Sequence, residues 1–151
     1  MIGTDVLLAK KLKKIGKGKL NGWGGKKEKH ETITECAVRE FETESGVKIN
    51  PRDLILVGSV DFVTHNSDGS TTLFKVFVHR IYVWKGTFRA TREMGMPKAY
   101  STHSLPFDKL MPADRYWLPE MLRQRDIKAY VEYGPKQKSL RKVVRLVYDA
   151  N

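Results

Sequence analysis

Apolar positions divide the chain into short strands and two helices. Runs rich in β-branched and aromatic residues predict strands at 5–11, 54–64, 71–84, 98–103, 127–133 and 140–148. The turn signals HNSDGS at 65–70 and Gly134-Pro135 separate neighbouring strands. The segment 11–27 is rich in glycine and lysine and leaves little to bury, so it predicts a loop.

The first helix has readable ends. Thr32 is its expected N-cap, because Glu35 stands three residues later at the spacing of a capping box. Ser45-Gly46 is the expected C-terminal stop. A four-residue repeat predicts the buried stripe, made of Ile33, Ala37 and Phe41. A second helix is expected from Pro112 to Arg123.

Strands interleaved with two helices predict an α/β (α+β) fold with a mixed sheet packed between helices. A chain of 151 residues and 17.3 kDa without repeats or a linker suits a single domain, 1–151.

Composition changes the picture through charge. Lysine and arginine outnumber aspartate and glutamate by 28 to 17, for a net charge of +11, which attracts polyanions; solubility alone is the other interpretation. The single cysteine, Cys36, excludes an internal disulfide, lies beside the buried stripe and favours a reducing cytoplasm. No apolar run approaches the roughly 20 residues of a membrane span, so no membrane association is expected.

An acidic segment interrupts this basic chain, with glutamates at Glu31, Glu35, Glu40, Glu42 and Glu44. On a helix, Glu40 and Glu44 lie about 40° apart and repel each other. A solvated charged face is one interpretation. Neighbouring cations, or a divalent magnesium ion with oxygen ligands, are the other.

The glycines before this helix favour the second interpretation, because Gly22, Gly24 and Gly25 allow the backbone to approach a ligand closely. The pattern G25-x5-E31-x7-R39-E40-F41-x-x-E44-x-G46-V47 resembles the signature box of the Nudix hydrolases. NGWGGK at 21–26 and the segment 93–119 resemble the MutT-like, oxidised-purine triphosphatase branch of that family. The resemblance spans about residues 6–130.

The resemblance implies a Nudix-type α/β/α sandwich and a metal-dependent hydrolase. It implies Mg²⁺, for which Mn²⁺ can substitute, with Gly24 (through its carbonyl), Glu40, Glu44 and Glu93 as ligands. Glu40 and Glu44 are also the implied catalytic carboxylates. Arg39 is implied to join the helix to the box loop through an ion pair.

Other residues are expected to bind the substrate. Lys11 and Lys26 can neutralise phosphates, and Gly25 lies in the close-approach loop. Asn21, Phe62, Met111 and Asp114 are the implied base contacts.

Two departures from the family pattern affect chemistry. Thr43 stands where the family has a glutamate, and a neutral hydroxyl is a poor magnesium ligand, so we expect weaker or fewer metals. In the base pocket Ala113 lacks the carboxylate that the branch carries, and Met111 replaces a stacking ring. Looser base discrimination is therefore expected. In addition, only four residues precede Asp5, where relatives carry a strand, so we expect either that the sheet lacks one strand or that the start of this chain is not the natural one.

The function expected from these residues and this resemblance is Mg²⁺-dependent pyrophosphohydrolysis of nucleoside triphosphates, with oxidised purines as a candidate class. The products would be a nucleoside monophosphate and pyrophosphate. A non-catalytic nucleotide- or RNA-binding Nudix domain, and a hydrolase of dinucleoside polyphosphates or capped RNA, are the alternatives. The sequence leaves open whether the protein is a monomer or a homodimer.

Overall fold

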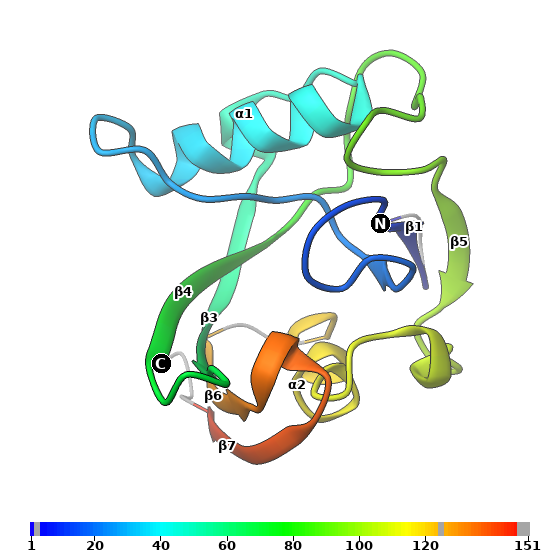
Figure 1. The fold of residues 1–151 in the computed structure, drawn as a ribbon. Coiled ribbons are helices and arrows are strands. Elements are labelled where there is room, and N and C mark those ends of the chain that lie inside the picture. The colour runs from blue at the N-terminus through cyan, green and yellow to red at the C-terminus, as the bar shows by residue number, and fades with distance from the viewer. Residues whose placement is uncertain (2–3, 124–125, 148–151) are drawn as a thin grey trace. The chain divides into compact units, whose positions relative to one another are not determined.

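The computed structural model describes the whole chain except residues 2–3, 124–125 and 148–151. The described residues form seven strands and two α-helices, with three short 3₁₀ helices between them (Figure 1). The strands are β1 Asp5–Lys10, β2 Leu20–Asn21, β3 Ile55–His65, β4 Thr71–Arg80, β5 Lys98–Ser101, β6 Ile127–Tyr133 and β7 Leu140–Val147. The helices are α1 Ile33–Ser45 and α2 Asp114–Met121. No helix in this described part is long and apolar enough to cross a membrane.

Contacts divide the chain into two compact units. The first contains residues 1–55 and 80–109, and the second contains residues 56–79 and 110–151.

In the first unit, β1 is the central strand of a three-stranded sheet with the order β2-β1-β5. Both of its neighbours are antiparallel to it: Ala9 pairs with Asn21 in β2, and Leu8 pairs with Lys98 in β5. Because side chains alternate between the faces of a strand, this register assigns each residue of β1 to one face of the sheet.

Helix α1 begins and ends where the sequence predicts. The Thr32 hydroxyl accepts a hydrogen bond from the Glu35 amide, and the Glu35 carboxylate accepts one from the Thr32 amide, which completes the capping box. Gly46 ends the helix in the left-handed region at φ 81°, a conformation that glycine adopts without strain. Of the predicted stripe, Phe41 is buried, whereas Ile33 and Ala37 are only half-buried.

An aromatic cluster anchors α1 to the loop before it. The ring of Trp23 packs edge-on against Phe41, with centroids 5.3 Å apart, and stacks on Phe88 at 5.4 Å. Phe41 also belongs to the buried core of this unit, together with Val47 and Ile49. Trp23 directly precedes Gly24 and Gly25, so this packing fixes the glycine loop against the helix.

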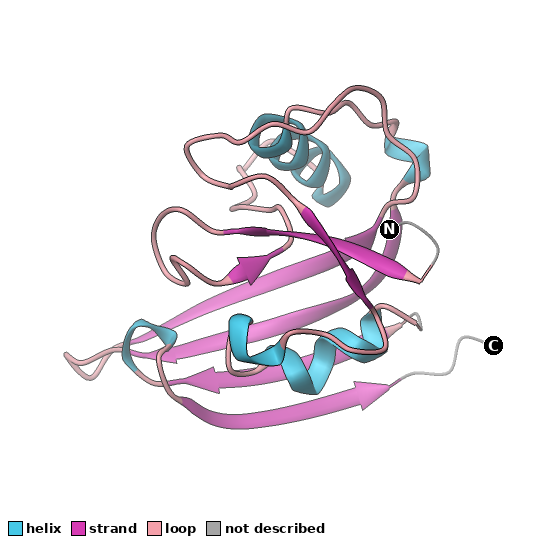
Figure 2. Ribbon diagram, turned by 90° about the vertical axis from the view of Figure 1, so that its right-hand side faces the viewer, coloured by secondary structure: helices cyan, strands magenta, loops and turns pink. Residues whose placement is uncertain are grey.

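The second unit contains the four-stranded sheet β4-β3-β6-β7 (Figure 2). Strand β6 runs parallel to β3 and antiparallel to β7, which confirms the predicted mixed pairing. The core includes the fully buried residues Val57, Val60, Met121, Ile127, Val131 and Tyr133.

The α+β class is confirmed, and the strands form two sheets. Several boundaries differ from prediction. β2 lies within the predicted loop, β4 ends at Arg80 rather than 84, and α2 is shorter than 112–123 at both ends. The predicted end of the last strand, Tyr148, lies outside the described residues, and the expectation of a missing strand before Asp5 falls partly on residues 2–3, which are also outside them.

Candidate active site

Arg39 joins α1 to the preceding loop of the signature box, residues 26–31, as the family resemblance implies. Its guanidinium donates to both carboxylate oxygens of Glu31, at 3.0 and 2.6 Å, and to the Lys26 carbonyl at 3.1 Å. A further N–H donates to Glu40 at 2.6 Å. The Arg39 guanidinium, followed by the Glu28 amide, lowers the pKa of Glu31 to about 2, so Glu31 is ionised at neutral pH. The loop 26–31 is therefore held to the helix by charge-assisted hydrogen bonds.

Glu44 is a buried carboxylate in an acidic environment. Glu44 is only 8 % exposed, and one of its carboxylate oxygens accepts a hydrogen bond from the Gly24 amide at 3.2 Å. Burial, followed by the neighbouring charges of Glu40 and Glu93, raises the pKa of Glu44 to about 7, although the Gly24 hydrogen bond opposes this rise. The structure thus brings Glu40, Glu44 and Glu93 into one electrostatic neighbourhood.

Two hydrogen bonds to backbone carbonyls position the loop that contains Glu93. The Leu12 amide donates to the Glu93 carbonyl at 2.9 Å, which attaches the loop to the end of β1. The Thr91 hydroxyl donates to the Glu44 carbonyl, also at 2.9 Å, which attaches it to the end of α1. The family resemblance implies Glu93, but nothing in the sequence predicts Thr91, because the contact of Thr91 with Glu44 joins segments 47 residues apart.

Lys11 lies in the electrostatic field of Glu44 and Glu93. Burial lowers the pKa of Lys11, and the charges of Glu44 and Glu93 oppose this decrease. Asn21, the predicted base contact, is exposed on β2, and its side-chain oxygen accepts from the Gly22 amide at 2.8 Å. Ala9 pairs with Asn21, so Lys11, two residues after Ala9, belongs to the same face of the sheet. The side chain of Lys26, the other predicted phosphate contact, is exposed.

The glycine loop meets the acidic pair at Gly25. A Cβ added there would lie 2.6 and 2.7 Å from the two carboxylate oxygens of Glu40, so any other residue at this position would displace the Glu40 carboxylate.

The carboxylates of Glu40, Glu44 and Glu93 suit a hard divalent cation. Oxygen donors crowd together, and their mutual repulsion is what a cation would relieve. In the described ranges, no three or more His, Cys, Asp or Glu side chains are placed together so that they could hold a metal ion. Glu40 and Glu44 instead direct oxygens to Arg39 and Gly24.

The predicted base contacts Phe62, Met111 and Asp114 belong to the second unit, where Tyr133 connects them. The ring of Tyr133 stacks on Phe62, with centroids 6.2 Å apart, and its hydroxyl accepts from the Ala113 amide at 3.0 Å. Asp114 is 6 % exposed and accepts from the Met111 amide at 3.2 Å. Burial raises the pKa of Asp114 to about 7, a rise that the Met111 amide partly offsets.

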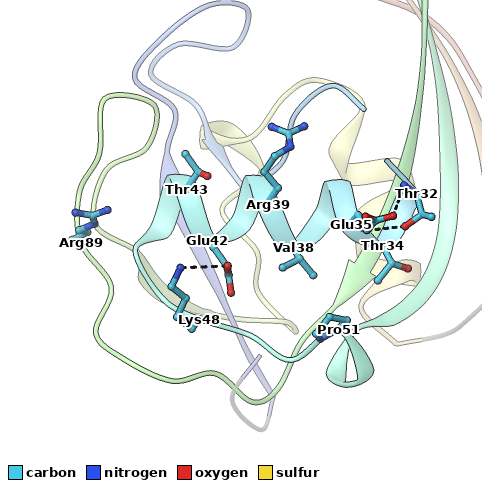
Figure 3. Close-up of a pocket in the computed structure, with 10 residues that line it drawn as sticks. All are labelled: Thr32, Thr34, Glu35, Val38, Arg39, Glu42, Thr43, Lys48, Pro51 and Arg89. Atoms are coloured by element: carbon cyan, nitrogen blue, oxygen red, sulfur yellow. Dashed lines mark hydrogen bonds and ion pairs between the residues drawn. The ribbon is translucent and has the colours of Figure 1, made fainter. Parts of the chain in front are cut away.

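Thr43 is exposed on α1, three residues after Glu40 and directly before Glu44. It lines an open pocket of about 670 Å³ together with Val38, Glu42 and Arg89 (Figure 3). Glu42 points away from Thr43 and accepts from the Ile49 amide at 3.0 Å, so it serves the helix end. The Glu42 carboxylate therefore does not take the place of the glutamate that the family carries at position 43.

The raised pKa of Glu44 predicts a pH-dependent stability effect. Relative to an unfolded chain, folding disfavours ionised Glu44, so its contribution to stability is lost as pH rises from about 4.5 to about 7. In metal-free protein we expect Glu44→Gln to raise the free energy of unfolding by on the order of 2 kcal/mol near pH 8 and to have little effect near pH 4. Urea unfolding in EDTA at both pH values measures this.

Asp53→Asn, at an exposed carboxylate, is the control and should have little effect at either pH. An equal effect of Glu44→Gln at both pH values would contradict the assignment.

Comparisons with known proteins agree with this geometry. The NUDIX domain family matches residues 1–130. The oxidized purine nucleoside triphosphate hydrolase of Mus musculus is 34% identical over 120 residues, which cover 80% of this chain and 73% of that protein. The protein of the same name from Danio rerio is 32% identical over 128 residues, covering 85% and 78% of the two chains.

Solved structures share the fold. The crystal structure of the MutT protein from Bacillus halodurans matches with a TM-score of 0.76 and 21% identity, over 96% of this chain and 92% of that one. A MutT Nudix hydrolase from Burkholderia pseudomallei matches with a TM-score of 0.62 and 22% identity, over 82% and 90% of the two chains. The family match, the identity to the curated proteins and the glycine-loop helix with its acidic end together show that the chain belongs to the Nudix hydrolases, in the MutT-like branch.

Proposed function

We propose that the protein hydrolyses nucleoside triphosphates to a nucleoside monophosphate and pyrophosphate, and that oxidised purine nucleotides are its substrate class. The buried carboxylate of Glu44, beside Glu40 and Glu93 at the glycine loop, carries this proposal. The names of the Mus musculus and Danio rerio relatives support the substrate class.

Nudix hydrolases are generally dependent on divalent metals. The cluster of Glu40, Glu44 and Glu93, called the acidic group below, supports Mg²⁺ here. Glu40, Glu44 and Glu93, with the backbone of Gly24, would hold it. When bound, a divalent cation polarises phosphoryl oxygens and makes a water molecule more acidic.

The chain's own groups complete the proposed mechanism. Lys11 neutralises phosphate charge, and its half-buried position strengthens that interaction. Arg39 is a positioning residue, because its donors are engaged by Glu31, Glu40 and Lys26. A carboxylate of Glu40 or Glu44 accepts the proton of the attacking water.

We also propose that Asn21, Phe62, Met111 and Asp114 bind the base, and that the two units act as a single domain. The family match supports the second point, since residues 1–130 include segments of both units. The lone cysteine, Cys36, supports a reducing cytoplasm as the location.

The central experiment follows pyrophosphate release from ordinary and oxidised triphosphates with Mg²⁺. We expect Glu44→Gln to lower kcat by about 10²–10⁴-fold, because it removes a charged ligand or base. Glu42→Gln is the matched control on the same helix, and its amide oxygen can still accept from the Ile49 amide. Its activity should stay near that of the wild type.

Comparable rates for Glu44→Gln and wild type would remove Glu44 from the mechanism. No turnover by wild type on any triphosphate would argue for a binding module or for another Nudix substrate.

The family difference at Thr43 predicts a gain of function. Thr43→Glu supplies an additional carboxylate oxygen close to Glu40 and Glu44 on the helix, so we expect tighter Mg²⁺ binding and a lower Mg²⁺ concentration for half-maximal rate. Thr34→Glu, at an exposed threonine in the first turn of the same helix, is the control for added charge. An unchanged Mg²⁺ titration would mean that the acidic group is sufficient without this residue.

Asp114 is expected to control base preference rather than phosphate chemistry. With a pKa of about 7 its carboxyl group can donate or accept a hydrogen bond near neutral pH. Asp114→Asn fixes one donor and one acceptor, so we expect the kcat/KM ratio between oxidised and ordinary purines to change by about tenfold or more. Thymidine triphosphate hydrolysis should change much less. An unchanged substrate ranking would contradict a role for Asp114 in base recognition.

A further inference from the structure

A second cleft, lined by lysines, lies in the first unit apart from the acidic group. Its volume is about 480 Å³, and five lysines line it: Lys10, Lys17, Lys19, Lys98 and Lys109. The glutamates of the acidic group, Glu40, Glu44 and Glu93, are not among its lining residues.

Strand β1 separates this cleft from the candidate active site. Lys10 and Lys11 are consecutive residues of an extended backbone, so their side chains point to opposite faces of the sheet. Lys11 lies in the field of Glu44 and Glu93, whereas Lys10 lines the cleft. The register agrees with this division, because Leu8 pairs with Lys98 on the cleft face.

The cleft carries uncompensated positive charge. Asp108 is the one acidic residue in its lining, and Lys19 donates to the backbone carbonyl of Asp108, at 3.4 Å, rather than to its carboxylate. Among the described residues, none of the five lysines forms an ion pair. Five such charges around one concave surface attract a ligand with several phosphates.

The floor of the cleft is apolar. Leu8 and Leu20 are buried at 4 % and 7 % exposure, and the cleft is also lined by Met96, which is 55 % exposed, and by the half-buried Tyr100. Inorganic polyphosphate has no group to contact such a surface. Nucleic-acid bases do, since they stack on aromatic rings and pack on methionine while lysines contact the backbone.

We propose that this cleft binds single-stranded nucleic acid, with the lysines contacting successive phosphates and Tyr100 stacking on a base. This site is separate from nucleotide hydrolysis. A strand, rather than a mononucleotide, fits the number of lysines, because even a nucleoside triphosphate offers only three phosphate groups to five lysines. RNA and DNA share the required chemistry.

The test measures fluorescence anisotropy of a 5′-labelled, mixed-sequence 12-nucleotide RNA, and of the matching single-stranded DNA, in EDTA at several KCl concentrations. Lys98→Glu/Lys109→Glu is compared with the control Lys85→Glu/Lys138→Glu, which changes the net charge equally at exposed lysines outside the cleft. We expect the cleft variant to bind at least about tenfold more weakly and to reduce the salt slope by about 1.4. The control should bind within about threefold of wild type.

Tyr100 tests the stacking contact separately from charge. Tyr100→Ala should weaken binding by about fivefold or more, and Tyr100→Phe, which keeps the ring, should bind like wild type. Glu44→Gln should leave binding unchanged, which separates this site from the proposed hydrolysis. Binding to RNA, to DNA or to both supports the proposal.

Three results would overturn it. The first is equal weakening by the cleft and control variants, which would mean attraction by net charge alone. The second is displacement of the oligonucleotide by pyrophosphate or AMP at equal phosphate concentration, which would indicate a small-phosphate site. The third is a changed affinity in Glu44→Gln, a tightening above all because a carboxylate that repels phosphates is removed, which would place the strand in the active site.

Discussion

Burying Glu44 beside Glu40 is the constraint on which the candidate active site depends. Two carboxylates one helical turn apart repel, and burial makes the charge of Glu44 more costly still. The surrounding structure opposes this cost locally. The Gly24 amide donates to Glu44, and the Arg39 guanidinium donates to Glu40. What remains is a site that favours a proton or a cation, which is the property a metal-dependent hydrolase requires.

The five glutamates of the segment 31–44 make different contacts, which depend on their position along the chain. Glu31 binds Arg39 and joins the loop to the helix, Glu35 completes the N-terminal capping box, and Glu42 accepts from the Ile49 amide after the helix. Glu40 and Glu44 are the two to which we assign the proposed chemistry. Acidic residues that look alike in a basic sequence are therefore three structural supports and two proposed catalytic groups.

Strand β1 separates two neighbouring lysines in a similar way. Side chains alternate across the sheet, so Lys11 is placed with the acidic group and Lys10 with the lysine-lined cleft. One lysine thus lies on the face proposed for a nucleotide's phosphates, and the other lies on the face proposed for a longer polyanion.

The sequence by itself determined helix α1, its two ends and the mixed class of the fold, because each depends on contacts within a few turns or on strong periodicity. The Arg39 ion pair was implied by the resemblance to the family. It did not reveal β2, which has only two residues and exists through pairing with Ala9 and Lys10. Nor did it reveal the tie from Thr91 to Glu44, or the chain of contacts from Phe62 through Tyr133 to Ala113. Tertiary structure decided these features, because burial and pairing between distant segments have no signature in local residue order. The same burial raised the pKa of both Glu44 and Asp114, which the sequence shows only as ordinary carboxylates.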